Sequence, residues 1–174
     1  METAIVSVLC IALIVIGGMT MAQGFFTSVD ATAGGLEQIS TRDGAIMRTD
    51  ISTLSAIQPS SMFLNLTLRN SGQTKLASLD KWDLIVQYTD IGDVYHVIWL
   101  PYTSGALGDN QWIKEGIYLD AASRTEEVFE PGILNPGEEM IIQAKLNPAT
   151  KSATAHLVTV STPNGIPASI SFSR

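Results

Sequence analysis

The sequence predicts an α+β protein, in which one long N-terminal hydrophobic α-helix precedes an all-β sandwich of about eight or nine strands. Two observations lead to this prediction. An apolar run near the N-terminus carries no charge, and the rest of the chain consists of short runs of alternating apolar and polar residues separated by Pro- and Gly-rich turns. At 174 residues there is room for one ordinary domain and an appendage. We therefore predict a helix over residues 1–39 and a sandwich over residues 40–174.

The helix is predicted from a stretch without ionisable side chains. From Thr3 to Val29 the only titratable group is Cys10, which we interpret as a small apolar residue. At about 1.5 Å per residue, this stretch would form a helix roughly 40 Å long, enough to cross a bilayer. Its first part, Ala4–Ile16, is apolar on all sides. Every side of this segment must therefore be covered by lipid or by protein.

Three interpretations compete for the apolar segment. A cleaved secretory signal is disfavoured, because the flank before the run is acidic and the run is longer than a typical signal core. The segment could anchor a monomeric surface domain in a membrane, or it could start in the membrane and later pack against copies of itself. Small residues favour packing between helices, because they let two backbones approach closely. They are Ser7, Ala12, Gly17, Gly18, Thr20, Ala22 and Gly24.

If the helix packs against copies of itself, its large apolar and small residues form the contact. The predicted assembly residues are Ile5, Val8, Leu9, Ile11, Ala12, Ile14, Val15, Gly17, Gly18 and Phe25.

The β-domain is predicted from alternation and from turn residues. We place a hinge at Gly34-Gly35 and a first strand over 46–57. In the second strand, over 62–69, three leucines alternate with polar residues, which indicates a half-buried strand. The strand over 82–89 alternates in the same way, and the turn Asp90-Ile91-Gly92-Asp93 returns the chain into a strand over 94–100. The remaining predicted strands are 112–119, 126–130, 140–146, 155–160 and 168–172.

Composition and motifs exclude several function classes. The net charge of −7 and the absence of a basic patch argue against nucleic acid as a partner. His96 and His156 have no second ligand at metal-binding spacing, so we expect them to pack in the core or at its rim. The acidic residues between Glu126 and Glu139 lack the spacing of a calcium loop, and we expect a solvated face. No catalytic motif is recognisable, so we predict neither an enzyme nor a cofactor.

One sequence motif points to a covalent modification. Asn65-Leu66-Thr67 is a complete N-glycosylation sequon, and its asparagine falls on the polar face of the predicted second strand. Asn65 is therefore a candidate glycosylation site. Attached glycan would suit an extracellular surface.

The N-terminal third resembles the type IV pilin superfamily and, within it, the archaellins of the archaeal-type flagellum. The resemblance lies in the aliphatic run Ala4–Ile16, the Gly17-Gly18 pair, the exit through Phe25-Phe26, and the β-domain that follows. The N-terminus differs from the pattern of this superfamily in two respects. No Lys/Arg-Gly leader precedes Met1, so the chain is either already mature or processed differently. The glutamate that pilins carry near the fifth mature position is absent, as it generally is in archaellins, and Glu2 is the only acid there.

Two later phrases are similar to turns of archaellar and other immunoglobulin-like surface domains. They are Leu68–Leu76 and Leu134–Glu138. The resemblance implies an immunoglobulin-like sandwich and a structural, non-enzymatic subunit. Such a subunit stays in the membrane until an ATPase-driven export machinery inserts it into an extracellular helical homopolymer. This filament would be either a motility filament or a pilus. The alternative is a membrane-anchored surface sandwich, which would be an adhesin or an accessory stator component of the same machinery.

Overall fold

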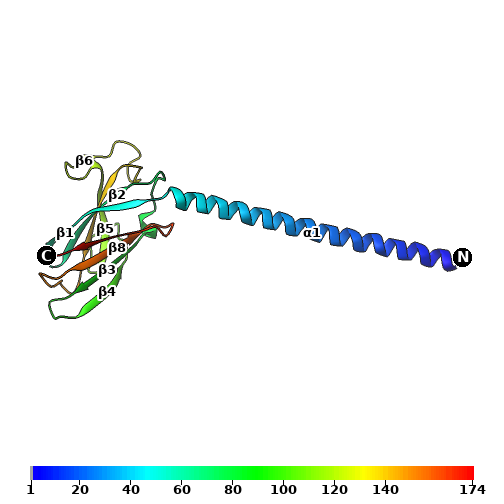
Figure 1. The fold of residues 1–174 in the computed structure, drawn as a ribbon, viewed down its shortest axis with the longest axis horizontal. Helices are drawn as coiled ribbons and strands as arrows, with labels where there is room; N and C mark the ends of the chain where they lie inside the picture. Colours follow the sequence, from blue (N-terminus) through cyan, green and yellow to red (C-terminus); the bar gives the residue numbers. More distant parts are fainter. Residues whose placement is uncertain (1) are drawn as a thin grey trace. The chain divides into compact units, whose positions relative to one another are not determined.

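Within the described residues, 2–174, the computed structural model contains one long α-helix followed by nine strands in two antiparallel sheets (Figure 1). Side chains are described from residue 5 onward. The predicted fold class is therefore confirmed. The predictions that concern Met1 and the side chain of Glu2 fall outside the described residues. Two compact units make up the chain, one ending at Gly44 and the other spanning Ala45–Arg174.

Helix α1 spans Glu2–Arg48 and is longer than predicted. The prediction of a hinge at Gly34-Gly35 was wrong, because the helix continues through both glycines. A glycine costs about 1 kcal/mol relative to alanine in a helix, but it does not break one whose neighbours favour helix, and Ala33, Leu36 and Glu37 are such neighbours. The division into units falls after Gly44, five positions beyond the predicted boundary at residue 39.

The last helical turn is held within the sandwich unit by backbone hydrogen bonds. The amide of Thr49 donates to the carbonyl of Ile46 (3.0 Å), which tightens the end of the helix, and the amide of Gln73 donates to the carbonyl of Arg48 (2.8 Å). The side chain of Asn164 also donates to the Thr49 hydroxyl (3.1 Å). Residues 46–48 are therefore helical, and the predicted start of the first strand at residue 46 was wrong.

Gly72 lies where the chain passes very close to residues 48–50. A Cβ atom at this position would stand 2.6 Å from the carbonyl oxygen of Arg48 and would also overlap the backbone of Asp50. Both obstacles are backbone atoms, which cannot rotate away. We expect Gly72→Ala to destabilise the sandwich by about 1 to 3 kcal/mol, the usual cost of overpacking, as measured by chemical denaturation.

Gly105→Ala provides the matched control for this substitution. Its added Cβ would meet only the Thr103 hydroxyl at 3.8 Å, which is an ordinary contact. An equal loss of stability in both variants would show that the close approach at Gly72 is unimportant.

Neighbouring strands are antiparallel in both sheets, and each sheet has its own strand order. The first has the strand order β1-β2-β7-β5-β6 and the second has the order β4-β3-β8-β9. A short 3₁₀ helix, Leu79–Lys81, precedes β3. The strands are β1 Ile51–Ser60, β2 Phe63–Asn70, β3 Asp83–Thr89, β4 Tyr95–Leu100, β5 Gln111–Asp120, β6 Thr125–Glu126, β7 Glu139–Lys145, β8 His156–Ser161 and β9 Pro167–Phe172.

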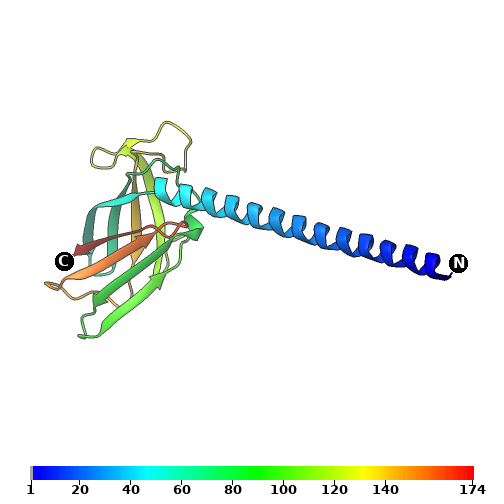
Figure 2. The same cartoon turned by 45° about the vertical axis from the view of Figure 1, so that its right-hand side comes forward.

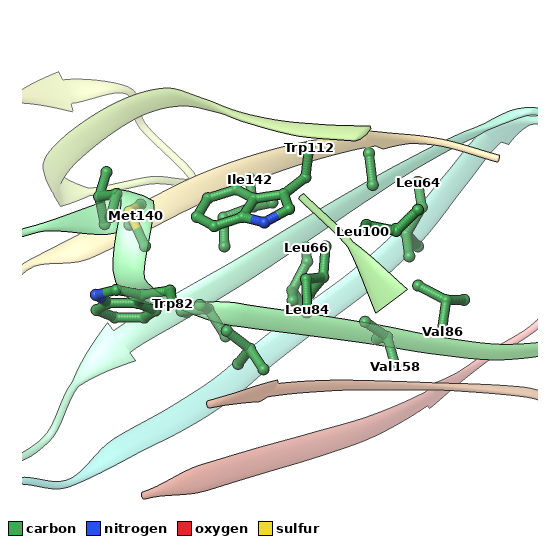
Figure 3. Packing of buried hydrophobic residues seen from close by; sticks show 14 of the residues in the cluster. Leu64, Leu66, Trp82, Leu84, Val86, Leu100, Trp112, Met140, Ile142 and Val158 are labelled. Carbon is green, nitrogen blue, oxygen red and sulfur yellow. The ribbon is translucent and has the colours of Figure 1, made fainter. Parts of the chain in front are cut away.

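Figure 2 shows the strands of the two sheets, and the core lies between them. Figure 3 shows how some of its buried hydrophobic side chains pack. The alternation predicted for the second and third strands is confirmed, since every second residue of β2 and β3 is buried. All members of the main core cluster come from residues 51–172, so the sandwich has a core of its own. Its largest fully buried side chains include Trp82, Trp112, Tyr88, Leu84, Leu100, Met140 and Ile142.

The hairpin predicted around residues 90–93 is also confirmed, because β3 and β4 pair from Leu84–Leu100 to Thr89–Tyr95 without a register shift. The strand predicted over 126–130 is mostly absent. Only Thr125–Glu126 forms β6, and the next residues enter a turn in which Glu130 adopts a positive φ of 53° before Pro131. Proline lacks the amide that a strand ladder requires.

Candidate assembly surfaces

From Ile5 onward, where side chains are described, the apolar surface of α1 is exposed. Its large aliphatic side chains are exposed, from 47% at Val29 to 74% at Ile14. The helix meets the length and hydropathy criteria for a membrane span. Apolar surface of this extent must be removed from water by lipid or protein. Each predicted assembly residue lies on this exposed surface: Ile5, Val8, Leu9, Ile11, Ala12, Ile14, Val15, Gly17, Gly18 and Phe25.

The helix surface carries apolar depressions between large and small side chains. Ile5, Val8, Leu9 and Ala12 line one of them, at the i, i+3, i+4 and i+7 spacing of one helix face. A second depression, around Thr32, is lined by residues 28–36. A Cβ atom added at Gly17 or Gly18 would meet nothing within 4 Å. These positions therefore offer room for the side chains of another helix.

Threonine hydroxyls on α1 are satisfied by the carbonyls of the helix itself. The hydroxyl of Thr20 donates to the carbonyls of Gly17 (2.9 Å) and Ile16 (3.1 Å), and that of Thr27 donates to the carbonyl of Gln23 (2.9 Å). Hydroxyls bonded in this way can enter an apolar environment without losing a partner. These threonines are thus compatible with lipid and with close packing against protein.

Asn65 lies in β2, opposite Gln143 of β7, and is partly buried. Its side-chain oxygen Oδ1 accepts a hydrogen bond of 3.4 Å from the side-chain amide of Gln143. Asn65 also lines a surface groove over the five-stranded sheet together with Leu54, Ile57 and residues of the 121–124 turn. Its glycosylation stays a prediction.

Sequence reasoning missed that both histidines meet Tyr88. The Tyr88 ring stacks on His96 at 5.2 Å between centroids and contacts His156 edge-on at 6.3 Å. His156 is buried, and its Nε2 lies 3.0 Å from the carbonyl of Lys151. Its Nδ1 accepts a hydrogen bond of 3.4 Å from the amide of Thr89. This pattern fits a neutral, structural histidine.

The hairpin between β3 and β4 is held by the carboxylate of Asp90. It accepts hydrogen bonds from the amides of Gly92 (2.8 Å) and Val94 (2.9 Å), and its second oxygen lies 2.8 Å from Nε2 of His96. The hydrogen bond with His96 is the largest cause that lowers the pKa of Asp90, and the Val94 amide adds to it. Burial raises the pKa of the neighbouring Tyr88 to about 12.

We expect Asp90 to make the sandwich sensitive to acid. Because the pKa is lower in the folded chain than in the unfolded chain, the ionised carboxylate stabilises the fold above about pH 4, the ordinary range of a carboxyl. This contribution is lost as the pH falls through the lowered folded pKa. The stability difference between wild type and Asp90→Asn in denaturation experiments should therefore be largest near neutral pH and shrink in acid. A difference that stays constant with pH would contradict this assignment, and Asp80→Asn serves as a surface control.

The acidic residues between Glu126 and Glu139 were predicted to form a solvated face, and this prediction was wrong for some of them. Glu138 is buried, and its carboxylate accepts hydrogen bonds from the amide (2.8 Å) and side chain (3.2 Å) of Asn135. Glu139 accepts the amide of Ala121 (2.8 Å), and Glu127 accepts the amide of Gly132 (3.0 Å). These carboxylates hold turns in place by accepting backbone amides.

Comparison with known proteins adds information on the fold. No family model and no curated protein match the sequence. Among solved structures, the archaeal flagellum of Methanospirillum hungatei is similar with a TM-score of 0.51 and 12% identity, over 93% of this chain and 90% of that chain. The fold is shared with archaellum proteins. The archaeal flagellin FlaB1 from Methanocaldococcus jannaschii has a TM-score of 0.52 and 13% identity, over 72% of this chain and 89% of that chain.

Proteins of the archaellum stator, which differ in role from the filament proteins, also share this fold. The periplasmic stator complex of FlaF and FlaG from Sulfolobus acidocaldarius is similar with a TM-score of 0.52 and 20% identity, over 70% of this chain and 87% of that chain. Filament and stator proteins thus resemble this chain equally well in TM-score. At these identities the likeness establishes the fold but does not distinguish a filament role from a stator role.

Proposed function

We propose that this chain is a structural subunit that self-assembles into an extracellular helical filament of the archaellum or type IV pilus kind. Helices α1 from many copies would form the filament core, and the β-sandwiches would face outward. The partner of the chain is therefore the chain itself. The proposal assigns no catalytic role and needs no cofactor.

The observation that carries this proposal is the length of the exposed apolar surface on α1. Ile5 is 67% exposed and Ile39 is still 58% exposed. At 1.5 Å per residue these two side chains lie about 50 Å apart along the helix, whereas the hydrocarbon core of a bilayer is about 30 Å thick. Lipid alone leaves part of this surface in water. Neighbouring helices of the same kind would cover all of it.

The extent of the similarity to the M. hungatei flagellum supports the same proposal. The sandwich unit makes up about three quarters of the chain, whereas the match covers 93% of the chain. The similarity therefore includes most of the helix as well as the sandwich.

Assembly would exchange lipid for protein around α1. Before assembly the helix lies in the membrane, and an ATPase-driven machinery transfers it into the growing filament. Burial is worth roughly 25 cal/mol per Å² of apolar surface, so release of an assembled helix into water is strongly disfavoured. A head-to-tail contact that does not close into a ring continues as a helix. Glycan on Asn65 would then lie on the outer surface, and mass spectrometry of the native subunit tests for it.

A second candidate is an accessory protein that stays anchored in the membrane as part of the stator. The observation in its favour is the identity to the FlaF–FlaG complex, 20% against 12% to the flagellum. In this role α1 would remain in lipid, and the sandwich would bind other components. A membrane-anchored adhesin is a variant of this candidate, in which α1 would serve as the same lipid anchor.

Electron microscopy of material sheared from the cell surface separates these roles. The filament proposal expects abundant filaments, and mass spectrometry should identify this chain as their main component. If the chain is found only in the detergent-soluble membrane fraction and never in filaments, it is an anchored protein.

A further inference from the structure

Strand β4 forms an unprotected edge of the four-stranded sheet. Natural proteins protect sheet edges with charges, prolines, bulges or very short strands. The other three edge strands of the described sandwich show such features: β1 contains two register shifts and Pro59, β6 has two residues, and β9 begins at Pro167 and accepts a hydrogen bond from Thr53 of β1. In contrast, β4 contains no Lys, Arg, Asp, Glu, Pro or Gly, and it pairs with β3 without a shift.

The backbone of β4 presents hydrogen-bonding groups to this open edge. Thr89 pairs with Tyr95 across the hairpin. Its amide donates to His156 and its carbonyl accepts from Lys151, so both groups point toward β8 and away from β4. The Thr89–Tyr95 pair is therefore a non-hydrogen-bonded pair. Because such pairs alternate along an antiparallel ladder, the amides and carbonyls of Tyr95, Val97 and Trp99 point to the open edge.

The outer face of the same three residues is apolar and exposed. Tyr95 is 62%, Val97 59% and Trp99 57% exposed. The polar tips of the rings are already satisfied by β3, since the Tyr95 hydroxyl donates to Gln87 and the Trp99 indole donates to Asp83, both at 2.8 Å. A partner would thus meet apolar ring surfaces without having to supply acceptors for them.

The order of these side chains is self-complementary. If a second copy of β4 runs antiparallel about Val97, then Tyr95 lies opposite the partner's Trp99, and Val97 lies opposite the partner's Val97. Aromatic pairs and β-branched pairs are favourable across strands, and the strand contains no Lys, Arg, Asp or Glu that would repel its own copy. We propose that β4 is a homotypic interface, at which two copies of this chain join their four-stranded sheets into one continuous antiparallel sheet.

This pairing is independent of the filament contacts. It is isologous and closes after two copies, whereas a filament requires heterologous contacts that propagate. The pairing therefore needs no filament, and it can be tested on chains dissolved in detergent.

Cysteine cross-linking tests the pairing on the full chain. In a Cys10→Ser background, Val97→Cys places a thiol next to its own copy, and a short bifunctional thiol reagent should link two chains. Ser171→Cys is the matched control, because Ser171 is exposed and lies in the same row across the sheet, through Leu157 and Gln87, at the opposite edge. Adjacent thiols have an effective concentration near the millimolar range, so we expect at least about tenfold more dimer at Val97. Equal yields would overturn the proposal.

The register provides a second readout. A mixture of Tyr95→Cys chains and Trp99→Cys chains should cross-link faster than either variant alone, because antiparallel pairing places residue 95 opposite residue 99. Adding Val97→Lys to both variants should abolish this reaction, because it places two like charges face to face. Val97 is exposed, and circular dichroism checks that the lysine variants remain folded. The proposal fails if the mixture shows no preference or if the lysine variant still cross-links.

Discussion

Replacing Val8 with glutamate is expected to abolish filament formation. Val8 is 68% exposed on the isolated helix and borders the depression formed with Ile5, Leu9 and Ala12. In a core of packed helices each copy would bury an unpaired carboxylate, which costs several kcal/mol. Every subunit carries the change, so the loss accumulates along the filament. Electron microscopy of sheared surface material should show no filaments, and Ile11→Glu should have the same effect.

The controls distinguish lost assembly from lost folding or lost insertion. Val8→Leu keeps the apolar surface and should still form filaments. In Val8→Glu the chain should remain in the membrane fraction, because the insertion cost of one acidic residue, about 2.5 to 3.5 kcal/mol, is small compared with the gain from the remaining apolar side chains. The sandwich should retain its β-sheet circular dichroism. Filaments of normal length from the glutamate variant would contradict the proposed helix core.

The second large effect is expected in the sandwich core. Trp82 is 1% exposed, and its indole donates to the carbonyl of Ala77 at 3.2 Å. Trp82→Ala removes a large buried side chain and leaves that carbonyl without this donor, so we expect a loss of about 3 to 5 kcal/mol. Domains of ordinary size are stable by about 5 to 15 kcal/mol, so much of the stability of the fold would be lost.

Urea denaturation of residues 45–174 measures this effect, since the main core lies entirely within that unit. Phe129→Ala is the matched control, because Phe129 is an aromatic residue that is 72% exposed. Its truncation should change the free energy of unfolding by less than about 0.5 kcal/mol, as surface substitutions usually do. Similar losses in both variants would mean that Trp82 does not support the core.

Much of the fold could be predicted because local patterns in the sequence determine its elements. Alternation along β2 and β3 depends on local side-chain periodicity, and turn residues marked the hairpin at Asp90. The helix end could not be predicted in this way. It depends on contacts of residues 46–49 with Gln73 and Asn164, which are distant in sequence. The glycines at 34 and 35 suggested a break that the surrounding helix formers override.

The candidate surfaces were predictable only in part. The apolar run of α1 indicated its exposed residues directly, because the run is apolar on all sides and has no polar face to meet water. The contacts of Tyr88 with His96 and His156 depend on strand pairing between β3, β4 and β8, and no local motif encodes them. The open edge of β4 likewise follows from the strand order in the sheet, not from the sequence of the strand itself.

The central claim is that α1 finds its final environment among copies of itself, and photo-cross-linking in native material tests it most directly. Photoreactive leucine, which is nearly isosteric with leucine, would be incorporated at Leu9 and Leu13, both exposed on the helix. We expect irradiation of intact surface material to give a ladder of covalent multimers, with links between helices mapped by mass spectrometry. Adducts to lipid alone, with no links between chains, would contradict the claim.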